Sequence, residues 1–336
     1  MFRKLKKKYI IVWLSVLVIV IAGITFIINH KKIINTITGS ERSVVFGYIN
    51  SVQLHNPAVM IMKEKKLLEA EGLQVKWIEY FAEQYAMQDM AVGAVDFVTC
   101  GVVPVMSTHA HSVKLAVIAG SNQEGSSLIV DNSINTVEDL QNKKIATPSI
   151  NSSQDALLNL MAAENKLRIR HVTMRVPDMA DFLAKKEIDG FFAWAPYPSG
   201  AVEQNFGHEL LSASDILPCN QCCVLATTEK NFWGKHSVVK KVLKVYLDAY
   251  KWFLANREES IKLLSKNIGV PESLVRQAIL TVKYPYPPYC NTDSMYSLAR
   301  ELIDTHIITN IRADGVKPFI ENLYHPELIE LLTVSE

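Results

Sequence analysis

The chain has 336 residues, enough for two compact units of about 100 to 200 residues each. Hydrophobic residues make up 49% and charged residues 21% of it, which supplies material for packed cores and excludes global disorder. The formal net charge is only +1, and the one dense basic run lies at the N-terminus, so we expect no nucleic-acid partner.

The N-terminus has the pattern of a membrane anchor. A basic segment at 1–8 precedes an uncharged stretch, Tyr9–Ile28, whose length matches the about 20 residues that cross a bilayer as a helix. Because the positive charge comes first, we expect a cytoplasmic N-terminus, a single span in the cell membrane, a linker at 29–43 and an extracytoplasmic body. A signal peptide cleaved near Thr38-Gly39-Ser40 is the alternative, but the apolar core is longer than such peptides have, and no cysteine precedes Cys100 to accept a lipid.

The body begins with alternating strand and helix patterns. Pro57 opens a helical pattern and Gly72 follows its end, which fits helix boundaries. The predicted elements are strand 44–49, helix 57–71, strand 75–80, helix 83–92 and strands 97–100 and 115–119. Strands that alternate with helices predict parallel strands joined by crossover helices, and therefore an α/β lobe.

The same rhythm restarts near Ser127. The predicted elements are strand 127–130, a helix signal at 136–140, strand 144–148, helix 153–166, strand 172–176, helix 180–187, strand 190–194, a strand near Leu210 and strand 222–227. After this second α/β unit the pattern is helical, at 237–256, 258–266, 273–282 and 294–306. The sequence contains no short repeat and no low-complexity segment, which excludes solenoids.

Several segments, in this order, resemble a known family. They are Gly47–Tyr80, Ala91–Met106 (AVGAVDFVTCGVVPVM), Val137–Gln154 (VEDLQNKKIATPSINSSQ), Asp189–Ala201 (DGFFAWAPYPSGA) and Pro218–Phe232 (PCNQCCVLATTEKNF). Each is similar to a motif of the substrate-binding proteins of nitrate, sulfonate, taurine and bicarbonate importers, and together they cover most of the chain. The resemblance implies a type II periplasmic-binding-protein-like α/β fold of two lobes, each a mixed sheet flanked by helices, which close on a ligand by a hinge.

The resemblance also implies a division of the chain and a function. Lobe I would comprise 44–127 and 228–336, and lobe II 128–227. The chain would be the solute-binding component of an ABC importer, delivering a small anionic solute of the nitrate, sulfonate or taurine kind to a permease and its ATPase, without catalysis and without a cofactor. Ala195 stands where many relatives have glutamate, which leaves the ligand open. The alternatives are a membrane-tethered sensor, and an enzyme or precursor binder similar to the thiamine-pyrimidine synthases of the same fold.

The segment Ile150–Gln154 follows a predicted strand and opens a predicted helix. Free N–H groups and the positive end of a helix dipole attract anions, and serine hydroxyls add donors. We therefore predict that Ser152 and Ser153 bind an anionic head group. The alternative is an ordinary serine N-cap, which many helix starts have.

Other candidate contacts follow predicted strands, where the clefts of α/β sheets lie. His55 precedes the helix that Pro57 opens and, when protonated, would pair with an anion; the alternative is a solvated loop histidine. Trp194 and Tyr197 either contact the ligand or pack in the core. The full set of predicted binding residues is Tyr48, Ser51, His55, Cys100, Gly101, Asn122, Ser152, Ser153, Trp194, Tyr197 and Cys222.

The cysteines number five, so at least one thiol stays unpaired within the chain. Cys219, Cys222 and Cys223 form a CxxCC cluster, and CxxC spacing can bind zinc or act as a redox pair. Because no second CxxC and no HxxxH supplies a further zinc ligand, we predict cleft-lining thiols or a local disulfide, and no metal. The motifs of serine hydrolases, zinc proteases, P-loop proteins and dinucleotide-binding enzymes are missing from the sequence, so we predict no enzymatic activity.

Overall fold

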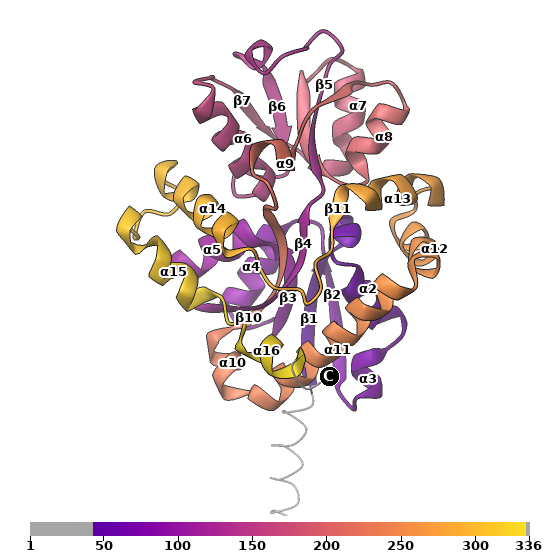
Figure 1. Ribbon diagram of the computed structural model, residues 1–336, viewed down its shortest axis with the longest axis vertical. Helices are drawn as coiled ribbons and strands as arrows, with labels where there is room; N and C mark the ends of the chain where they lie inside the picture. Colours follow the sequence, from indigo (N-terminus) through magenta and orange to yellow (C-terminus); the bar gives the residue numbers. More distant parts are fainter. Residues whose placement is uncertain (1–42, 334–336) are drawn as a thin grey trace, which may run out of the picture. The chain divides into compact units, whose positions relative to one another are not determined.

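The computed structural model describes residues 43–333, in which two β-sheets are each flanked by helices (Figure 1). From Val44 onward the chain forms one compact unit. The predicted basic segment 1–8, the predicted span 9–28 and the linker up to residue 42 lie outside the described residues. Among residues 43–333, no helix is both long enough and apolar enough to cross a membrane.

The first sheet has six strands. In spatial order they are β11 (Val282–Lys283), β4 (Leu115–Glu124), β10 (Gln221–Thr228), β3 (Phe97–Gly101), β1 (Ser43–Ile49) and β2 (Gln74–Tyr80). β1 and β3 run parallel, as the crossover pattern predicts, whereas β10 is antiparallel to both of its neighbours, β3 and β4. The sheet is therefore mixed, in agreement with the fold that the family resemblance implies.

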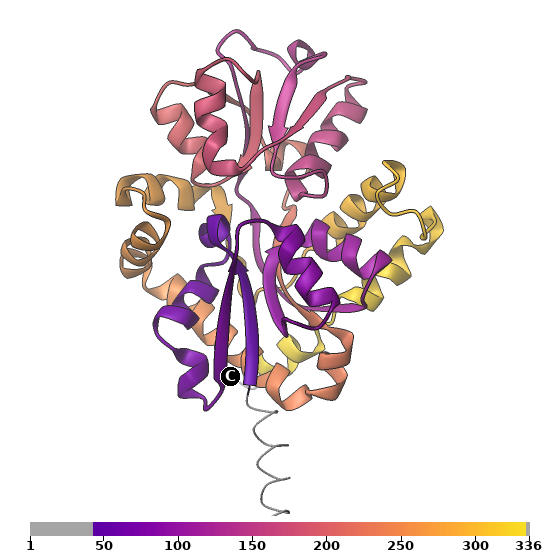
Figure 2. The same ribbon diagram turned by 180° about the vertical axis from the view of Figure 1, so that it is seen from behind.

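Helices surround this first sheet, and Figure 2 shows β1 and β2 from behind, between two helical layers. The helices are α2 (Pro57–Glu64), α3 (Leu67–Ala70), α4 (Glu83–Ala91), α5 (Val102–His111), α10 (Glu229–Gly234), α11 (His236–Ala255), α12 (Arg257–Ile268), α13 (Glu272–Ala278), α14 (Thr292–Asp304), α15 (Val316–Leu323) and α16 (Glu327–Thr333), with a 3-10 helix, η1 (Asn50–His55), before α2. α11 is the longest and buries Tyr246 and Tyr250, whose hydroxyls donate hydrogen bonds to the carbonyls of Gly120 (2.9 Å) and Ser121 (2.7 Å). These bonds fix the end of β4, where the chain leaves the first sheet.

The second sheet has five strands. In spatial order they are β7 (Arg170–Thr173), β6 (Lys144–Thr147), β8 (Gly190–Trp194), β5 (Ser126–Val130) and β9 (His208–Ser212), and the helices beside them are α6 (Ser153–Glu164), α7 (Met179–Ala184), α8 (Tyr197–Glu203) and α9 (Ala213–Ile216). β6 is parallel to β7 and β8, whereas β5 is antiparallel to β8 and β9. The loop after the parallel strand β6 leads into α6 and faces the first sheet.

Two segments connect the sheets. The first passes through Gly125, which has φ +85° and whose Cα lies so close to His55 that an added Cβ would stand 2.9 Å from the Nε2 atom. Both the left-handed backbone and this contact require glycine. The second runs from β9 through α9 to β10. β10 pairs with β3 and β4 and so belongs to the first sheet, although all of it except Thr228 falls inside the range 128–227 predicted for lobe II. The lobe boundaries otherwise stay a prediction.

Local differences from the predicted elements have local causes. The single helix predicted over 57–71 is interrupted at Lys66, which has φ +52° and separates α2 from α3. α5 was not predicted, because Val102 and Val103 favour strands and Pro104 suggests a turn. In the first helical turn, however, proline breaks no hydrogen bond. The strand predicted over 172–176 lies at Arg170–Thr173 instead.

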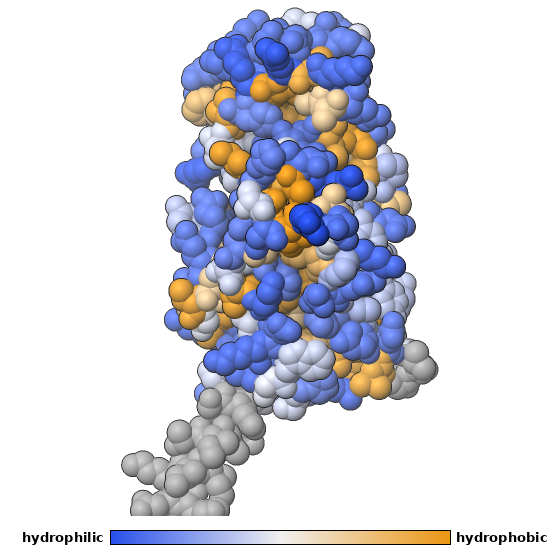
Figure 3. Space-filling view, turned by 90° about the vertical axis from the view of Figure 1, so that its left-hand side faces the viewer, coloured by the Kyte–Doolittle hydropathy of each residue, from blue (hydrophilic) through white to orange (hydrophobic). Residues whose placement is uncertain are grey.

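The surface on the side of α14 and α15 is mostly hydrophilic, and its apolar areas are small and separated (Figure 3). Buried polar side chains, by contrast, gather where the chain passes from one sheet to the other. They include Asn122, Glu124, Ser126, Ser127, Asn220 and Gln221. Burying polar groups costs free energy unless they are hydrogen-bonded. Their concentration here makes the space between the sheets a candidate binding site.

Candidate functional site between the two sheets

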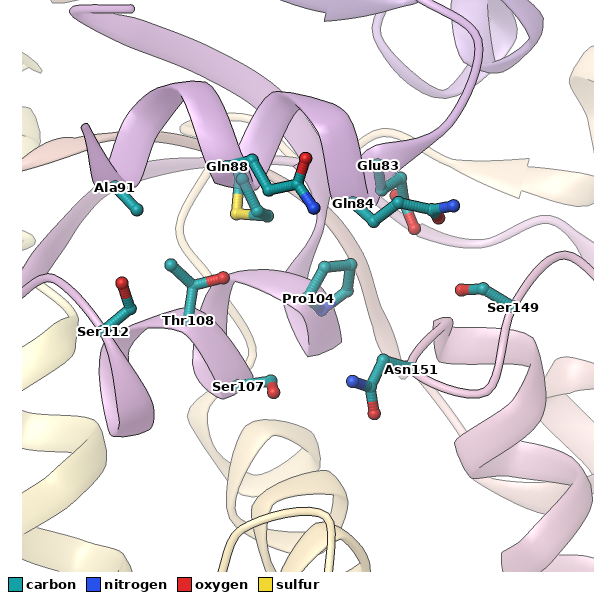
Figure 4. A pocket seen from close by; sticks show the side chains of 11 residues that line it. Glu83, Gln84, Gln88, Ala91, Pro104, Ser107, Thr108, Ser112, Ser149 and Asn151 are labelled. Atoms are coloured by element: carbon teal, nitrogen blue, oxygen red, sulfur yellow. The ribbon is translucent and has the colours of Figure 1, made fainter. Parts of the chain in front are cut away.

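A cavity of ≈ 240 Å³ lies between α4 and α5 on one side and the loop that precedes α6 on the other (Figure 4). Glu83 and Gln84 come from the start of α4, Pro104 and Ser107 from α5, and Asn151 from the loop. The cavity thus joins a helix pair of the first sheet to the carboxyl end of a parallel strand in the second. Ligands of open α/β sheets bind at such strand ends.

The N-terminus of α6 offers hydrogen-bond donors at this place. Ser152 is the N-cap: its hydroxyl accepts a hydrogen bond from the N–H of Asp155 (3.2 Å) and donates one to the carbonyl of Ser149 (2.8 Å). The hydroxyl of Ser153 is buried and has no hydrogen-bond partner among the described residues. A buried hydroxyl left unpaired costs about 1–3 kcal/mol, so this atom calls for a ligand or a water.

The N-terminus of α5 faces that serine and is already neutralised from within the protein. The backbone N–H of Gly101, its N-cap, donates a 2.6 Å hydrogen bond to Oε1 of Glu83. A Cβ on Gly101 would lie 2.7 Å from that oxygen and 3.3 Å from the Ser153 hydroxyl, so the carboxylate and the hydroxyl converge on the same glycine. Only glycine leaves room for both.

Glu83 is the functional candidate that the sequence analysis missed. It is 8% exposed, and burial raises its pKa to about 7, although the hydrogen bond from Gly101 opposes this. A carboxyl that titrates near neutral pH can change its charge under physiological conditions. An acidic residue in the first turn of a helix is common, so nothing in the sequence distinguished Glu83 from a surface residue.

A second cluster lies where the two connecting segments meet. His55 is completely buried, with Nε2 3.1 Å from the carbonyl of Gly125 and Nδ1 3.1 Å from both Cys222 Sγ and Asn122 Nδ2. The alternative of a solvated loop histidine is therefore wrong. Since the Gly125 carbonyl can only accept, Nε2 carries a proton, and Nδ1 faces the thiol and the amide.

The cysteines of this cluster differ in their acidity. A hydrogen bond from Cys223 and the adjacent His55 hold the pKa of the Cys222 thiol well below its usual range, against the effect of burial. Burial raises the pKa of Cys223 and of Cys100 well above theirs. His55, Cys222 and Cys223 also place three potential metal-ligating atoms within 4.8 Å of one another.

The sequence is similar to those of a known protein family. A model of the NMT1-like family matches residues 38–267, more than half of the chain. The chain belongs to the NMT1-like family. Among relatives, this NMT1-like chain is 24% identical over 319 residues to the taurine-binding periplasmic protein of Escherichia coli K12, covering 90% of the chain and 94% of that protein.

Solved structures agree with this assignment at the level of the fold. The NMT1-like chain is similar to the periplasmic nitrate-binding protein NrtA of Synechocystis PCC 6803, with a TM-score of 0.76, 13% identity, and 88% of this chain and 89% of that chain covered. It is also similar to the periplasmic aliphatic sulphonate binding protein SsuA of Escherichia coli, with a TM-score of 0.70, 18% identity, and 85% and 92% covered. The NMT1-like chain thus has the two-lobed α/β fold of periplasmic binding proteins.

The remaining predicted residues lie in three settings. Tyr48 is buried, and its hydroxyl donates to Glu79 (2.7 Å) and accepts from Lys63 (2.6 Å), on the β1–β2 side of the first sheet. The Cys100 thiol contacts only the Gly101 carbonyl, at 3.6 Å, among the hydrogen bonds of the described part. The side chain of Ser51 lies outside what the structure describes.

Trp194 and Tyr197 belong to the second sheet of this NMT1-like chain. Trp194 is 5% exposed and pairs across β8 and β5 with Ser126, beside the first connecting segment. Tyr197 opens α8 and is half-buried, packed against the core. Of the predicted site residues, Gly101 and Ser153 lie together beside the cavity, and His55, Asn122 and Cys222 form a second cluster. Their roles in binding stay a prediction.

Proposed function

We propose that this chain is the extracytoplasmic solute-binding component of an ABC importer, which captures a small solute between its two lobes and delivers it to a permease. Family membership and the names of the relatives support the general role. The observation that supports a specific site is the buried, unpartnered hydroxyl of Ser153 at the N-terminus of α6. An anionic head group there would accept hydrogen bonds from this hydroxyl and from the first N–H groups of the helix.

The charge of Glu83 indicates which kinds of solute can bind beside Ser153. When ionised, its carboxylate repels a plain anion such as nitrate, because it lies on the same glycine as Ser153. An ammonium group, in contrast, would pair with it. We infer a zwitterion that carries a sulfonate-like head group at Ser153 and an amine at Glu83, that is, an amino sulfonate of the taurine kind.

A ligand screen on the purified full-length chain tests this proposal. Taurine should raise the melting temperature, because a ligand that binds only the folded state adds about 2.7 kcal/mol at a hundredfold excess over its dissociation constant. Ethanesulfonate, which lacks the amine, and nitrate should shift it less at pH 8. Absence of a shift with taurine, alkanesulfonates and nitrate at millimolar concentrations would rule out the proposed solute class.

Transport and topology need separate tests in the native host. Deleting the gene should abolish uptake of the solute, and antibodies to the chain should co-precipitate a permease and its ATPase. Alkaline phosphatase fused after Ser43 should be active, since we propose that the body lies outside a single N-terminal span. Normal uptake after deletion would favour a tethered sensor instead.

A further inference from the structure

The cluster of His55, Cys222 and Cys223 is not explained by solute binding. All three residues are buried, with exposures of 0%, 4% and 1%, and their ligating atoms lie within 4.8 Å of one another. The third cysteine of the sequence motif, Cys219, is only half-buried and lies elsewhere: its Sγ is 3.7 Å from Nζ of Lys283. The potential metal-ligating atoms therefore come from the adjacent Cys222 and Cys223 and from a histidine 167 positions from Cys222, and not from the CxxC pair of Cys219 and Cys222.

The backbone of β10 brings the two adjacent thiols together. Successive side chains of a regular strand point to opposite faces of the sheet, which would separate them. Here the register of β10 against β4 shifts on both sides of Cys223, and such a bulge redirects a side chain. The two Sγ atoms are 3.7 Å apart. Two thiolates at ~2.3 Å from one tetrahedral zinc ion stand about 3.8 Å apart, so the pair already has the required spacing.

The histidine is oriented as a ligand by an outer contact. Its Nε2–H donates to the Gly125 carbonyl at 3.1 Å, which leaves the Nδ1 lone pair directed at Cys222. Metal-ligating histidines characteristically give their other N–H to a carbonyl or carboxylate. Asn122 accepts from the N–H of Cys223 (3.2 Å), which fixes its amide so that Nδ2 is a donor beside the cluster. With an ion on Nδ1, this N–H would donate to a ligating thiolate.

We propose that His55, Cys222 and Cys223 form a three-ligand site for a thiophilic divalent ion of the Zn²⁺ class. Two thiolates balance the charge of the ion, so the loaded site is neutral, as burial requires, and both sulfur atoms bind the ion in their deprotonated form. Soft sulfur ligands select against Mg²⁺ and Ca²⁺. The ion would link η1 to β10 and, through the Gly125 contact, to both connecting segments, with a fourth position left for water or another ligand.

Titration of the reduced, metal-stripped full-length chain with Co²⁺ tests the site. One equivalent should give intense visible bands and a thiolate-to-cobalt charge-transfer band, and one equivalent of Zn²⁺ should abolish both. Cys223→Ser and His55→Gln should weaken Zn²⁺ binding at least hundredfold. Cys219→Ser is the matched control and should bind as the wild type does. Loss of the site in Cys219→Ser, or its retention in Cys223→Ser, would overturn the proposal.

A second measurement needs no variant and so does not depend on whether a substituted chain folds. X-ray absorption at the zinc edge of the loaded wild-type chain should show two sulfur ligands and at least one imidazole nitrogen. A shell of oxygen and nitrogen alone, or no stoichiometric binding at all, would contradict the assignment. Neither measurement uses taurine or any other solute, so the result is independent of the proposed import function.

Discussion

The N-termini of α5 and α6 face each other between the sheets, but their hydrogen-bond donors differ in whether they have a partner within the protein. At α5, the N-cap N–H of Gly101 is bonded to the Glu83 carboxylate. At α6, Ser152 caps one N–H, but the Ser153 hydroxyl has no partner among residues 43–333. Each helix end carries about half a positive charge, so the first is compensated internally and the second is left for a ligand. The contrast indicates where each end of a zwitterion would bind.

The largest expected effect comes from placing a charge at the second helix end. Ser153→Asp should weaken taurine binding by about 4 kcal/mol, the repulsion of two unit charges ~4 Å apart at an effective dielectric constant of 20. Aspartate is favourable in the first turn of a helix, but the new carboxylate would lie near Glu83, so urea unfolding should first show that the variant is folded. Ser153→Asn has the same shape without the charge and is the control. Equal, small losses in titration calorimetry for both variants would remove the anionic head group from this site.

The burial of Glu83 at the N-terminus of α5 should make the free energy of unfolding depend on pH. The folded-state pKa of Glu83 is raised from 4.5 to about 7, so the folded chain holds a proton that the unfolded chain releases, and stability falls as pH rises between these values. Glu83→Gln keeps the acceptor for Gly101 and removes this loss. It should gain up to about 3 kcal/mol at pH 8 and little near pH 4.5.

Urea unfolding at the two pH values measures this difference. The exposed Glu164 ends α6, so Glu164→Gln removes an equal charge without burial and is the matched control. It should change the free energy of unfolding by less than about 0.5 kcal/mol at either pH. A gain in Glu83→Gln that is independent of pH would show that the carboxyl is not destabilised by burial.

The same substitution should reverse the ligand preference of the site. Glu83→Gln should weaken taurine binding by about 1.5–3 kcal/mol at pH 8, because the charged partner of the amine is lost. Ethanesulfonate should bind more tightly to this variant than to the wild type, since a repulsive carboxylate has been removed. Glu164→Gln again serves as the control in calorimetry. Parallel losses for both ligands would argue that Glu83 only maintains the structure.

The smallest expected effect is that of one hydroxyl. Ser153→Ala should weaken taurine binding by about 1 kcal/mol, a single hydrogen bond, because the backbone N–H groups of α6 remain. Ser107 on α5 lines the cavity but is not one of the buried, unpartnered hydroxyls of the described residues, and it provides the control. Ser107→Ala should leave the dissociation constant unchanged, and a loss equal to that of Ser153→Ala would show that the hydroxyl at α6 has no special place.

Local signals made part of this molecule predictable from sequence. Pro57 marks the start of α2, and Ser152 marks the start of α6. The alternation of strands and helices predicted two α/β units because most strands are followed by a helix, although β4 leads directly into β5. α5 was not predicted, because its first residues have strand and turn propensities that packing overrides in the folded chain.

The site was less predictable, because its groups meet only in three dimensions. Cys222 contacts a histidine 167 positions away, and the shift in strand register that turns it toward Cys223 leaves no mark in the sequence. The CxxCC motif suggested Cys219 as a partner, whereas the fold directs that thiol to Lys283. Glu83 is buried against Gly101 only in the folded chain, so its sequence position gave no sign of its raised pKa.

The pH dependence of binding shows whether an amine of the ligand pairs with Glu83. Titration calorimetry of the wild-type chain should compare taurine with ethanesulfonate at pH 6 and pH 8, on either side of the Glu83 pKa of about 7. We expect taurine to bind up to about tenfold more tightly at pH 8, where the carboxylate is ionised, and ethanesulfonate to bind more weakly there. If both ligands weaken together as the pH rises, or neither depends on pH, the pairing of an amine with Glu83 is contradicted.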